Sequence, residues 1–469
     1  MRTVTLSLVS HTNVGKTTLA RTLLGADVGE VRDAPHVTEF ADGHELIATE
    51  EGDRLRLWDT PGFGDSARLA RRLLASSNPI GWFLSQVWDR WRDRGFWASQ
   101  QAMRHVQAES DVVLYLVNAA ESPDAAGYVA PEMDLLAWVG KPVLVLLNQL
   151  GEPRGPEIEA EEIQAWRDHL ARWPRVQAVL SLDAFARCWV HEQTLLREVQ
   201  RQLPADKAAA MQRLAQAWEL RNQQRFDAAM LALAQTLAQM ALSREGQSAG
   251  QDVDAARQAL AVQLQDRMRE LTDRLLALHG IGGQAREEFL QRAPAMFDLR
   301  ARVDEKKVSV LAGVVGGLLT GLKADIASGG LTLGGGMLAG GVIGALGAGG
   351  LARLVNVVRG TDQSWLRVSE EALAALVEQA VLRYLAVAHF GRGRGEWVKG
   401  QAPAHWPGTV AEALLPQQAA LQALWAARDP KAVEPDAALL AARLQPLLIT
   451  AVRETLGRLY PAVQPKLSA

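Results

Sequence analysis

The sequence has very little cysteine and no large excess of either charge. Its 469 residues include one cysteine, Cys188, so an intrachain disulfide is excluded and a structural zinc site lacks the ligands it needs. The formal net charge is −3, which provides no overall basic field for nucleic acid. We therefore expect a protein of a reducing compartment, cytoplasmic, with no specific nucleic-acid partner.

Other common signals are also missing from the sequence. The first run, MRTVTLSLVS, has no small-residue cleavage site, so it favours a strand over a signal peptide. Neither a regular internal repeat nor a cluster of histidine and cysteine stands out. A chain of 469 residues is too long for one ordinary core, so we expect two or three domains.

The clearest motif present lies at residues 10–18 and reads SHTNVGKTT. The phosphate-binding P-loop pattern is G-x-x-x-x-G-K-[ST], which this stretch satisfies except that Ser10 replaces the first glycine. A β-rich run at residues 3–9 precedes the loop, and a helical run ending near Gly25 follows it, which is the context that a P-loop needs. Because serine is small, we expect the turn to be kept.

The expected chemistry of this loop is phosphate and magnesium binding. Backbone N–H groups of a P-loop and of the helix after it point at phosphate oxygens. Lys16 is expected to reach the β- and γ-phosphates, and the Thr17 hydroxyl to bind Mg²⁺. The predicted nucleotide-binding residues here are Ser10, Asn13, Val14, Gly15, Lys16, Thr17 and Thr18.

A second motif follows a predicted β-hairpin. Two β-like runs, residues 46–49 and 54–58, flank the turn sequence EEGD, and the second runs into DTPG at residues 59–62. This fits the D-x-x-G motif of GTPases, in which Asp59 holds the Mg²⁺ shell and the Gly62 N–H meets the γ-phosphate. With both motifs at this spacing, a chance match at the P-loop is no longer plausible.

Two further apolar runs complete the predicted fold. DVVLYLVNA (residues 111–119) and KPVLVLLNQ (residues 141–149) are typical of strands buried on both faces. Helical patterns separate them, and this alternation predicts an α/β P-loop NTPase fold with a doubly wound, mostly parallel sheet. We expect this domain to cover residues 1–203, with its ligand at the carboxyl edge of the sheet.

These motifs together resemble the translation-factor class of GTPases, near Era and TrmE. The resemblance covers about residues 1–190 and rests on the two motifs above, a candidate switch threonine, Asn148 and Ser181. The phrases GKTTLARTLL and SLDAFARCWVHE, with a glycine-rich region, also resemble a bacterial group of GTPases with a C-terminal domain of unknown function. The resemblance implies GTP and GDP as ligands, Mg²⁺ as cofactor and GTP hydrolysis as the activity.

One departure from this class concerns catalysis. Phe63 stands where Ras-type enzymes have a glutamine that orients the attacking water, so a low intrinsic rate is expected. TrmE-like GTPases have asparagine at the position of Asn13, where it helps to bind K⁺ beside the phosphates. The resemblance thus implies K⁺ as a second cation and Asn13 as a catalytic residue with Lys16. The alternative is that Asn13 only stabilises the loop.

Switch I is expected within residues 29–43, GEVRDAPHVTEFADG. Thr38 is the candidate that closes over Mg²⁺ through its hydroxyl, so it is a predicted catalytic residue as well as a metal ligand. Thr17, Thr38 and Asp59 then form the predicted metal-binding set. The alternative is that Thr38 is an ordinary strand residue.

The base-reading motif departs most from the class. GTPases use [NT]-K-x-D, whereas residues 148–151 read NQLG, so the aspartate that pairs with guanine is Gly151. Glu152 and Asp183 are candidate replacements, and ATP binding is the alternative if neither serves. The remaining predicted base-site residues are Asn148, Gln149, Ser181 and Leu182.

An aromatic segment lies in an expected insert at about residues 66–108. Residues 81–97 read GWFLSQVWDRWRDRGFW and contain four of the 14 tryptophans. Trp88 and Trp91 are i,i+3 neighbours on a helix. Three interpretations stay open: a helix packed on the GTPase domain, a docking element for an unknown protein partner, or a helix at a membrane surface.

The second half of the chain is helical in pattern, which predicts an all-α domain at residues 204–469 on which the GTPase acts. Long amphipathic runs at 206–242 and 252–278 favour a bundle or helical hairpins. Further helical stretches are expected at residues 361–390, 409–427 and 436–458.

Glycines recur every four residues in two sets within residues 308–352. These are Gly313, Gly317 and Gly321, then Gly336, Gly340 and Gly344. Each set makes a flat face, which predicts a glycine-zipper helical hairpin. The charge-free run at 326–352 is long enough to span a bilayer, so peripheral or integral attachment at the inner face of the cytoplasmic membrane is one interpretation. A tightly packed soluble hairpin is the other.

Overall fold

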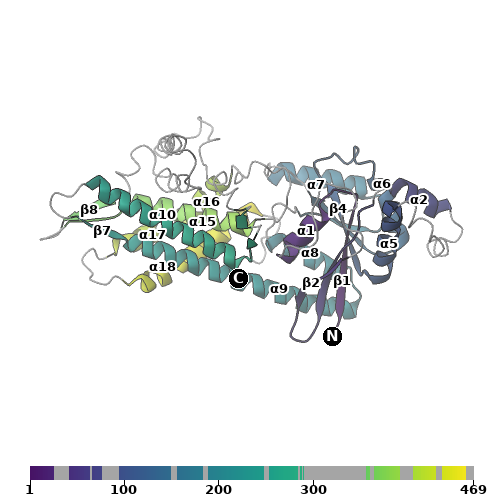
Figure 1. Cartoon of the computed structure of the whole chain (residues 1–469), viewed down its shortest axis with the longest axis horizontal. Coiled ribbons are helices and arrows are strands. Elements are labelled where there is room, and N and C mark those ends of the chain that lie inside the picture. The colour runs from purple at the N-terminus through teal and green to yellow at the C-terminus, as the bar shows by residue number, and fades with distance from the viewer. Residues whose placement is uncertain are drawn as a thin grey trace. The chain divides into compact units, whose positions relative to one another are not determined.

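A computed structural model gives the arrangement of most of the chain (Figure 1). It describes residues 1–25, 42–63, 66–75, 94–148, 156–182, 189–247, 253–283, 286–287, 289, 355–359, 364–390, 405–428 and 436–460. The chain forms two compact units, one built on Met1–Gln223 and the other on Gln224–Ala388 and Lys399–Ala469. Each unit is described by itself below.

The first unit is organised by a six-stranded sheet. Its strands are β1 (Thr3–Ser10), β2 (Asp42–Ala48), β3 (Arg54–Asp59), β4 (Val112–Asn118), β5 (Val143–Asn148) and β6 (Val176–Ser181). The strand order is β2-β3-β1-β4-β5-β6, in which β2 pairs antiparallel with β3 and all other pairs are parallel. The predicted hairpin and mostly parallel sheet are therefore confirmed.

Helices cover both faces of this sheet, as expected for a doubly wound fold (Figure 1). The helices are α1 (Lys16–Leu24), α2 (Ser66–Ala75), α5 (Arg94–Glu109), α6 (Val129–Val139), α7 (Pro156–Leu170), α8 (Trp189–Arg201) and the first part of α9 (Ala205–Leu242). Alternate residues of a strand point to opposite faces. Accordingly Leu114 of β4 lies in the core on the side of α1 and α8, whereas Tyr115 lies in the core on the side of α5 and α6.

The first part of α9 contacts the sheet of this unit closely. Met211, Leu214 and Trp218 recur at i, i+3 and i+7 and belong to the same buried cluster as the inward residues of β1. Lys207 forms an ion pair with Asp111 at 2.6 Å, and α9 forms a second pair between Arg213 and Asp53 at 2.6 Å. Residues 205–223, from the segment predicted to begin the helical domain, thus complete one core of the sheet.

The second unit is mainly helical, and this confirms the predicted class of the C-terminal part. It contains the later part of α9, α10 (Val253–Leu278), α15 (Glu370–Ala388), α16 (Trp406–Leu414), a 3₁₀ turn η1 (Leu415–Gln417), α17 (Gln418–Ala426) and α18 (Ala437–Leu459). The predicted helical stretches at 206–242, 252–278, 409–427 and 436–458 correspond to these elements.

A small antiparallel sheet adds to this unit and corrects one helical prediction. Its strands, in the order β7-β9-β8, are β7 (Arg244–Gln247), β8 (Val355–Arg359) and β9 (Ser364–Val368). The prediction of helix from residue 361 was wrong for β9, where buried Leu366 and Val368 alternate with less buried neighbours. The helix begins only after Ser369, whose hydroxyl caps it by accepting a hydrogen bond from the Ala372 N–H at 3.0 Å.

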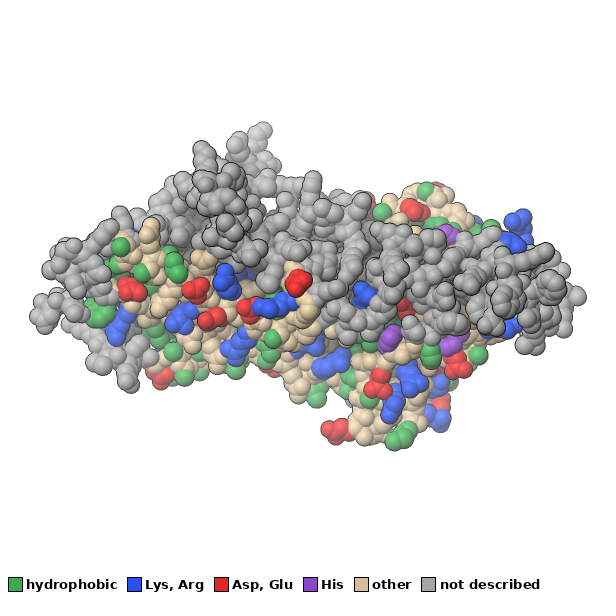
Figure 2. Space-filling view, viewed as in Figure 1, with side chains coloured by type: hydrophobic (Ala, Val, Ile, Leu, Met, Phe, Trp, Pro, Cys, Tyr) green, Lys and Arg blue, Asp and Glu red, His purple; other side chains and the backbone are tan. Residues whose placement is uncertain are grey.

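Several sequence predictions lie outside the described residues. These are Thr38 with most of switch I, Gln149, Gly151, Glu152, Asp183, the aromatic residues 81–93 and the glycine-rich segment 308–352. Among the helices that are described, none combines the length and apolarity needed to cross a membrane. On the face of the molecule in Figure 2, acidic and basic side chains are interspersed over the described helices of the second unit.

Candidate functional site

The P-loop connects β1 to α1 at the carboxyl edge of the sheet. Gly15 precedes α1 with a φ of 94°, a left-handed conformation that glycine adopts without strain. Asn13 has a φ of 65° and is the one non-glycine residue with positive φ in the described part of the chain. Asparagine tolerates this conformation better than most residues, so the backbone gives Asn13 a role in shaping the loop.

Lys16 is buried beneath this loop. Its Nζ donates to the Ser10 hydroxyl at 3.0 Å. Burial lowers the pKa of Lys16, and the negative charges of Asp59 and Glu132 oppose that shift. Ser10, the residue that departs from the P-loop pattern, is therefore the hydrogen-bond partner of Lys16.

The D-x-x-G segment packs directly against the P-loop. A Cβ atom built on Gly62 would lie 2.9 Å from the Lys16 Nζ and 3.1 Å from the Thr12 Cα, so only glycine fits without displacement. The Phe63 N–H donates to the Ser10 carbonyl at 3.0 Å, and the Thr60 hydroxyl donates to the Leu8 carbonyl at 2.5 Å. These bonds extend the pairing of β1 and β3 into the two loops.

Thr17 and Asp59 meet beside Lys16. The Thr17 hydroxyl donates to the Asp59 Oδ2 at 2.5 Å, across the gap between α1 and the end of β3. A hydroxyl and a carboxylate are the oxygen donors that Mg²⁺ prefers, and Mg²⁺ commonly takes only one or two protein ligands, with water and phosphate completing its shell. The two side chains therefore fit the predicted metal role, and the third predicted ligand, Thr38, lies outside the described residues.

The expected base side of the site is only partly described. The Asn148 amide donates to the Val14 carbonyl at 2.6 Å, which ties the end of β5 to the P-loop. The Leu182 N–H donates to the Leu147 carbonyl at 3.2 Å and holds the end of β6 beside β5. Ser181 is the last residue of β6, so the predicted base-contacting loop starts at the same sheet edge.

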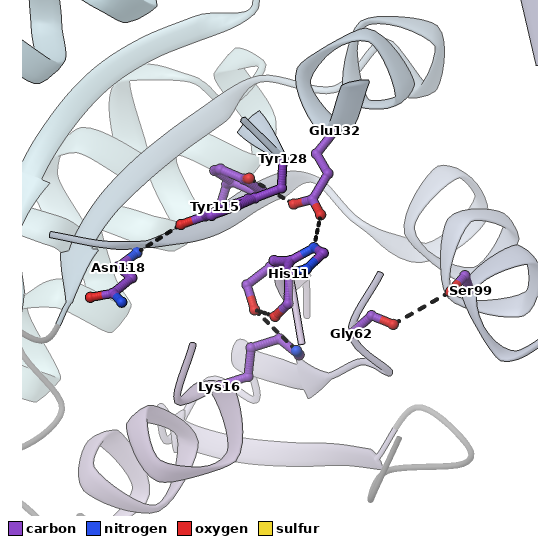
Figure 3. Close-up of polar contacts among 9 residues, drawn as sticks. His11, Lys16, Gly62, Ser99, Tyr115, Asn118, Tyr128 and Glu132 are labelled. Carbon is purple, nitrogen blue, oxygen red and sulfur yellow. Dashed lines mark hydrogen bonds and ion pairs between the residues drawn. The ribbon is translucent and has the colours of Figure 1, made fainter. Parts of the chain in front are cut away.

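Phe63, the residue after the D-x-x-G segment, does not face the P-loop. Its side chain is fully buried in the core on the α5 and α6 side of the sheet. The ring is therefore part of the hydrophobic core. On the neighbouring residue, the Gly62 carbonyl accepts a hydrogen bond from the Ser99 hydroxyl of α5 at 3.4 Å (Figure 3).

Sequence reasoning missed a polar cluster next to the P-loop (Figure 3). The His11 Nδ1 lies 2.7 Å from the Glu132 Oε1, and the Tyr115 hydroxyl donates to the Glu132 Oε2 at 2.7 Å. Tyr128 stacks on the imidazole with ring centres 4.7 Å apart. The available signal was a glutamate on the apolar face of the run PEMDLLAW and a tyrosine inside the buried run VVLYLV. Which helix contacts the loop, however, is decided only by the tertiary structure.

Two family models match the chain. Residues 5–149 match "50S ribosome-binding GTPase", and residues 167–439, more than half of the chain, match "Domain of unknown function (DUF3482)". The GTPase Der of Mycolicibacterium vanbaalenii is 28% identical over 160 residues, which cover 34% of this chain and 27% of that protein. The chain thus spans about a quarter of the length of this curated relative.

Solved structures of Era also align with the N-terminal part. Era in complex with MgGDPNP and a segment of 16S ribosomal RNA is 17% identical, with a TM-score of 0.32. An Aquifex aeolicus Era variant bound to GDP and AlF₄⁻ is 18% identical, with the same TM-score. Each alignment covers 44% of this chain and 58% of the other.

The family matches agree with the fold and with the motifs at the sheet edge. The N-terminal domain is of the P-loop GTPase type, and the C-terminal part is the domain of unknown function. The chain belongs to the DUF3482 family, and its residues 5–149 are similar to a GTPase family.

Proposed function

We propose that the protein binds GTP with Mg²⁺, hydrolyses it slowly, and acts as a switch on its C-terminal helical part. The observation that carries this proposal is the convergence of four groups at one sheet edge: the Lys16 ammonium, the Thr17 hydroxyl, the Asp59 carboxylate and the Gly62 backbone. The match of residues 5–149 to a GTPase family supports guanine nucleotide as the ligand.

In this proposal each group has a separate task. Lys16 leaves the Ser10 hydroxyl and donates to the β- and γ-phosphates, because phosphate oxygens are stronger acceptors than a hydroxyl. Thr17 and Asp59 hold Mg²⁺, which when bound neutralises charge on the phosphates. The Gly62 N–H donates to the γ-phosphate and loses that partner after hydrolysis, which is the signal of the switch.

The low rate follows from what stands beside the phosphates. With the Phe63 ring in the core, this position supplies no side chain to orient water. We propose that Asn13, exposed at the turn of the P-loop, binds K⁺ there and thereby places positive charge beside the transferred phosphoryl group. Thr38 would close over Mg²⁺ from switch I.

The proposed route to the helical part is α9. It is a single helix of 38 residues, of which Ala205 to Gln223 belong to the first unit and the rest to the second. A helix transmits a displacement along its axis because its backbone hydrogen bonds are internal. A second candidate, nucleotide-gated scaffolding with incidental hydrolysis and membrane contact through residues 308–352, rests on the glycine pattern alone.

One experiment tests nucleotide choice and cation together. Binding of fluorescent GTP and ATP, and their hydrolysis, would be measured for the full chain with Mg²⁺ in KCl and in NaCl. We expect GTP to bind, KCl to accelerate hydrolysis, and Lys16→Ala to abolish binding, whereas Lys141→Ala, at a partly exposed lysine outside the P-loop, serves as control. Equal rates in the two salts exclude the K⁺ role, and preferred ATP binding assigns the site to adenine. Loss of cellular function in Lys16→Ala without hydrolysis in any cation favours the scaffold.

A further inference from the structure

A chain of polar contacts runs from the phosphate-binding lysine to a buried carboxylate on α6 (Figure 3). Lys16 donates to the Ser10 hydroxyl, which in turn donates to the backbone carbonyl of His11. The His11 imidazole meets Glu132 at 2.7 Å, and Glu132 accepts a further hydrogen bond from Tyr115.

Burying the Glu132 carboxylate costs free energy, so stability alone does not explain why it lies here. Its side chain has no exposed surface, and each carboxylate oxygen has one donor. Burial raises the pKa of Glu132, while His11 and Lys16 favour its charged form. A well-packed apolar residue of similar size commonly stabilises a fold as well as or better than a buried ionic group. The carboxylate is therefore better explained by what it holds than by the core it fills.

What Glu132 holds is a residue of the P-loop. The imidazole of His11 is fixed from one side by Glu132 and from the other by the Tyr128 ring, which is inclined by 20° to it. The backbone of His11 forms a parallel bridge with Phe63. Anchoring this one side chain thus fixes the backbone of the P-loop and that of the D-x-x-G segment at once.

We propose that Glu132 and His11 are positioning residues that hold these two backbones in register for the phosphates and set the charge next to Lys16. This rests on the nucleotide-binding function proposed above. The side chain of His11 is directed to α6, so it leaves the phosphate side of the loop to backbone N–H groups and to Lys16. Glu132 acts through His11 and does not touch the nucleotide.

The proposal also accounts for the charge beside the P-loop lysine. The negative charges of Asp59 and Glu132 oppose the lowering of the Lys16 pKa that burial causes, so they favour the charged ammonium. Glu132 thus helps to keep Lys16 charged for a polyanionic ligand.

The decisive variant is Glu132→Met, which keeps the volume and removes the charge. In the full chain we expect it to melt below wild type, because the buried Tyr115 hydroxyl and the His11 imidazole lose their partner. We expect kcat/KM for GTP to fall between about tenfold and a hundredfold, the range for losing a hydrogen bond to a charged group. Glu132→Gln, which can keep one acceptor, should recover part of the loss, and Asp134→Asn, exposed on the same helix, should match wild type.

A second measurement does not need nucleotide at all. Hydrogen exchange of peptides covering residues 10–16 and 60–63 in the nucleotide-free protein should be faster in Glu132→Met and unchanged in Asp134→Asn. The proposal is overturned if Glu132→Met equals wild type in kcat/KM and in exchange. If it fails to fold, the same two criteria apply to Glu132→Gln. If wild type binds neither GTP nor ATP, the nucleotide function is wrong, and unchanged exchange in the variant would separately refute the positioning role.

Discussion

Leu214 of α9 provides a direct test of where the GTPase unit ends. Its side chain is fully buried in the cluster that contains the inward residues of β1, although it lies beyond the predicted domain boundary at residue 203. Leu214→Ala removes three carbon atoms, which at about 0.8 kcal/mol each costs about 2.4 kcal/mol before any cavity term. Adding the cavity brings the expected loss to about 2–5 kcal/mol, as for other core leucines.

This loss can be read locally by hydrogen exchange of β1 in the full chain. Where exchange follows the opening equilibrium, 1.4 kcal/mol corresponds to about tenfold, so 2.4–5 kcal/mol accelerates exchange by about 50-fold to a few thousand-fold. The matched control is Leu220→Ala, the same change in the same helix at a side chain that is 59% exposed. Surface changes of this kind usually stay within about 0.5 kcal/mol, or about twofold.

The reasoning is refuted if the amide hydrogens of β1 exchange at the same rate in Leu214→Ala and in Leu220→Ala. That outcome would mean that α9 can detach from the sheet without opening it, and that residues 204–223 belong with the helical domain alone. An exchange rate only slightly above that of the control would indicate that other residues share in holding α9 on the sheet. Trp218 belongs to the same contact, and its Nε1 donates to Glu192 at 2.9 Å.

Three further predictions concern separate parts of the molecule. Gly62→Ala should weaken GTP binding and hydrolysis by at least about tenfold, because its Cβ would meet the Lys16 Nζ at 2.9 Å; unchanged kinetics would contradict the observed packing. Arg428→Met should lower the stability of the second unit by about 1–3 kcal/mol in urea unfolding, because it leaves the carbonyls of Ala241 and Val368 without this buried donor. Burial lowers the pKa of His191 to about 4, below its unfolded value. The stabilisation should therefore be present above pH ~6.5 and be lost as pH falls toward 4. His191→Gln should flatten this dependence of the free energy of unfolding on pH, and an equal dependence in both proteins would exclude this group as the cause.

Local sequence patterns were sufficient to predict most of the helices and strands. The P-loop needs one glycine at Gly15, a lysine and a hydroxyl between a strand and a helix, and all of these are neighbours in sequence. Gly25 also ends α1 as expected, with a φ of 65° and its N–H on the Arg21 carbonyl. The strand β9 was missed because five residues with alternating burial leave little signal, and one of its partners, β7, is far away in the chain.

The residues of the candidate site likewise fall into those that the sequence predicted and those that only the structure revealed. Lys16, Thr17, Asp59 and Gly62 were predicted as one site because D-x-x-G and P-loop motifs carry their own spacing. Their meeting depends on β1 pairing with β3, which the apolar pattern of the strands favours. The role of Ser10 as partner of Lys16 could not be predicted, since a small residue at that position is compatible with several hydrogen-bond arrangements.

The sequence by itself determined the fold class, the motifs and the family, because each depends on residues that are adjacent or regularly spaced. Only the tertiary structure decided which helix packs on which loop. It brought Glu132 to His11 across 121 positions and Arg213 to Asp53 across 160. Such contacts follow from how the faces of helices and strands fill a common core, and no local pattern of residues specifies that choice.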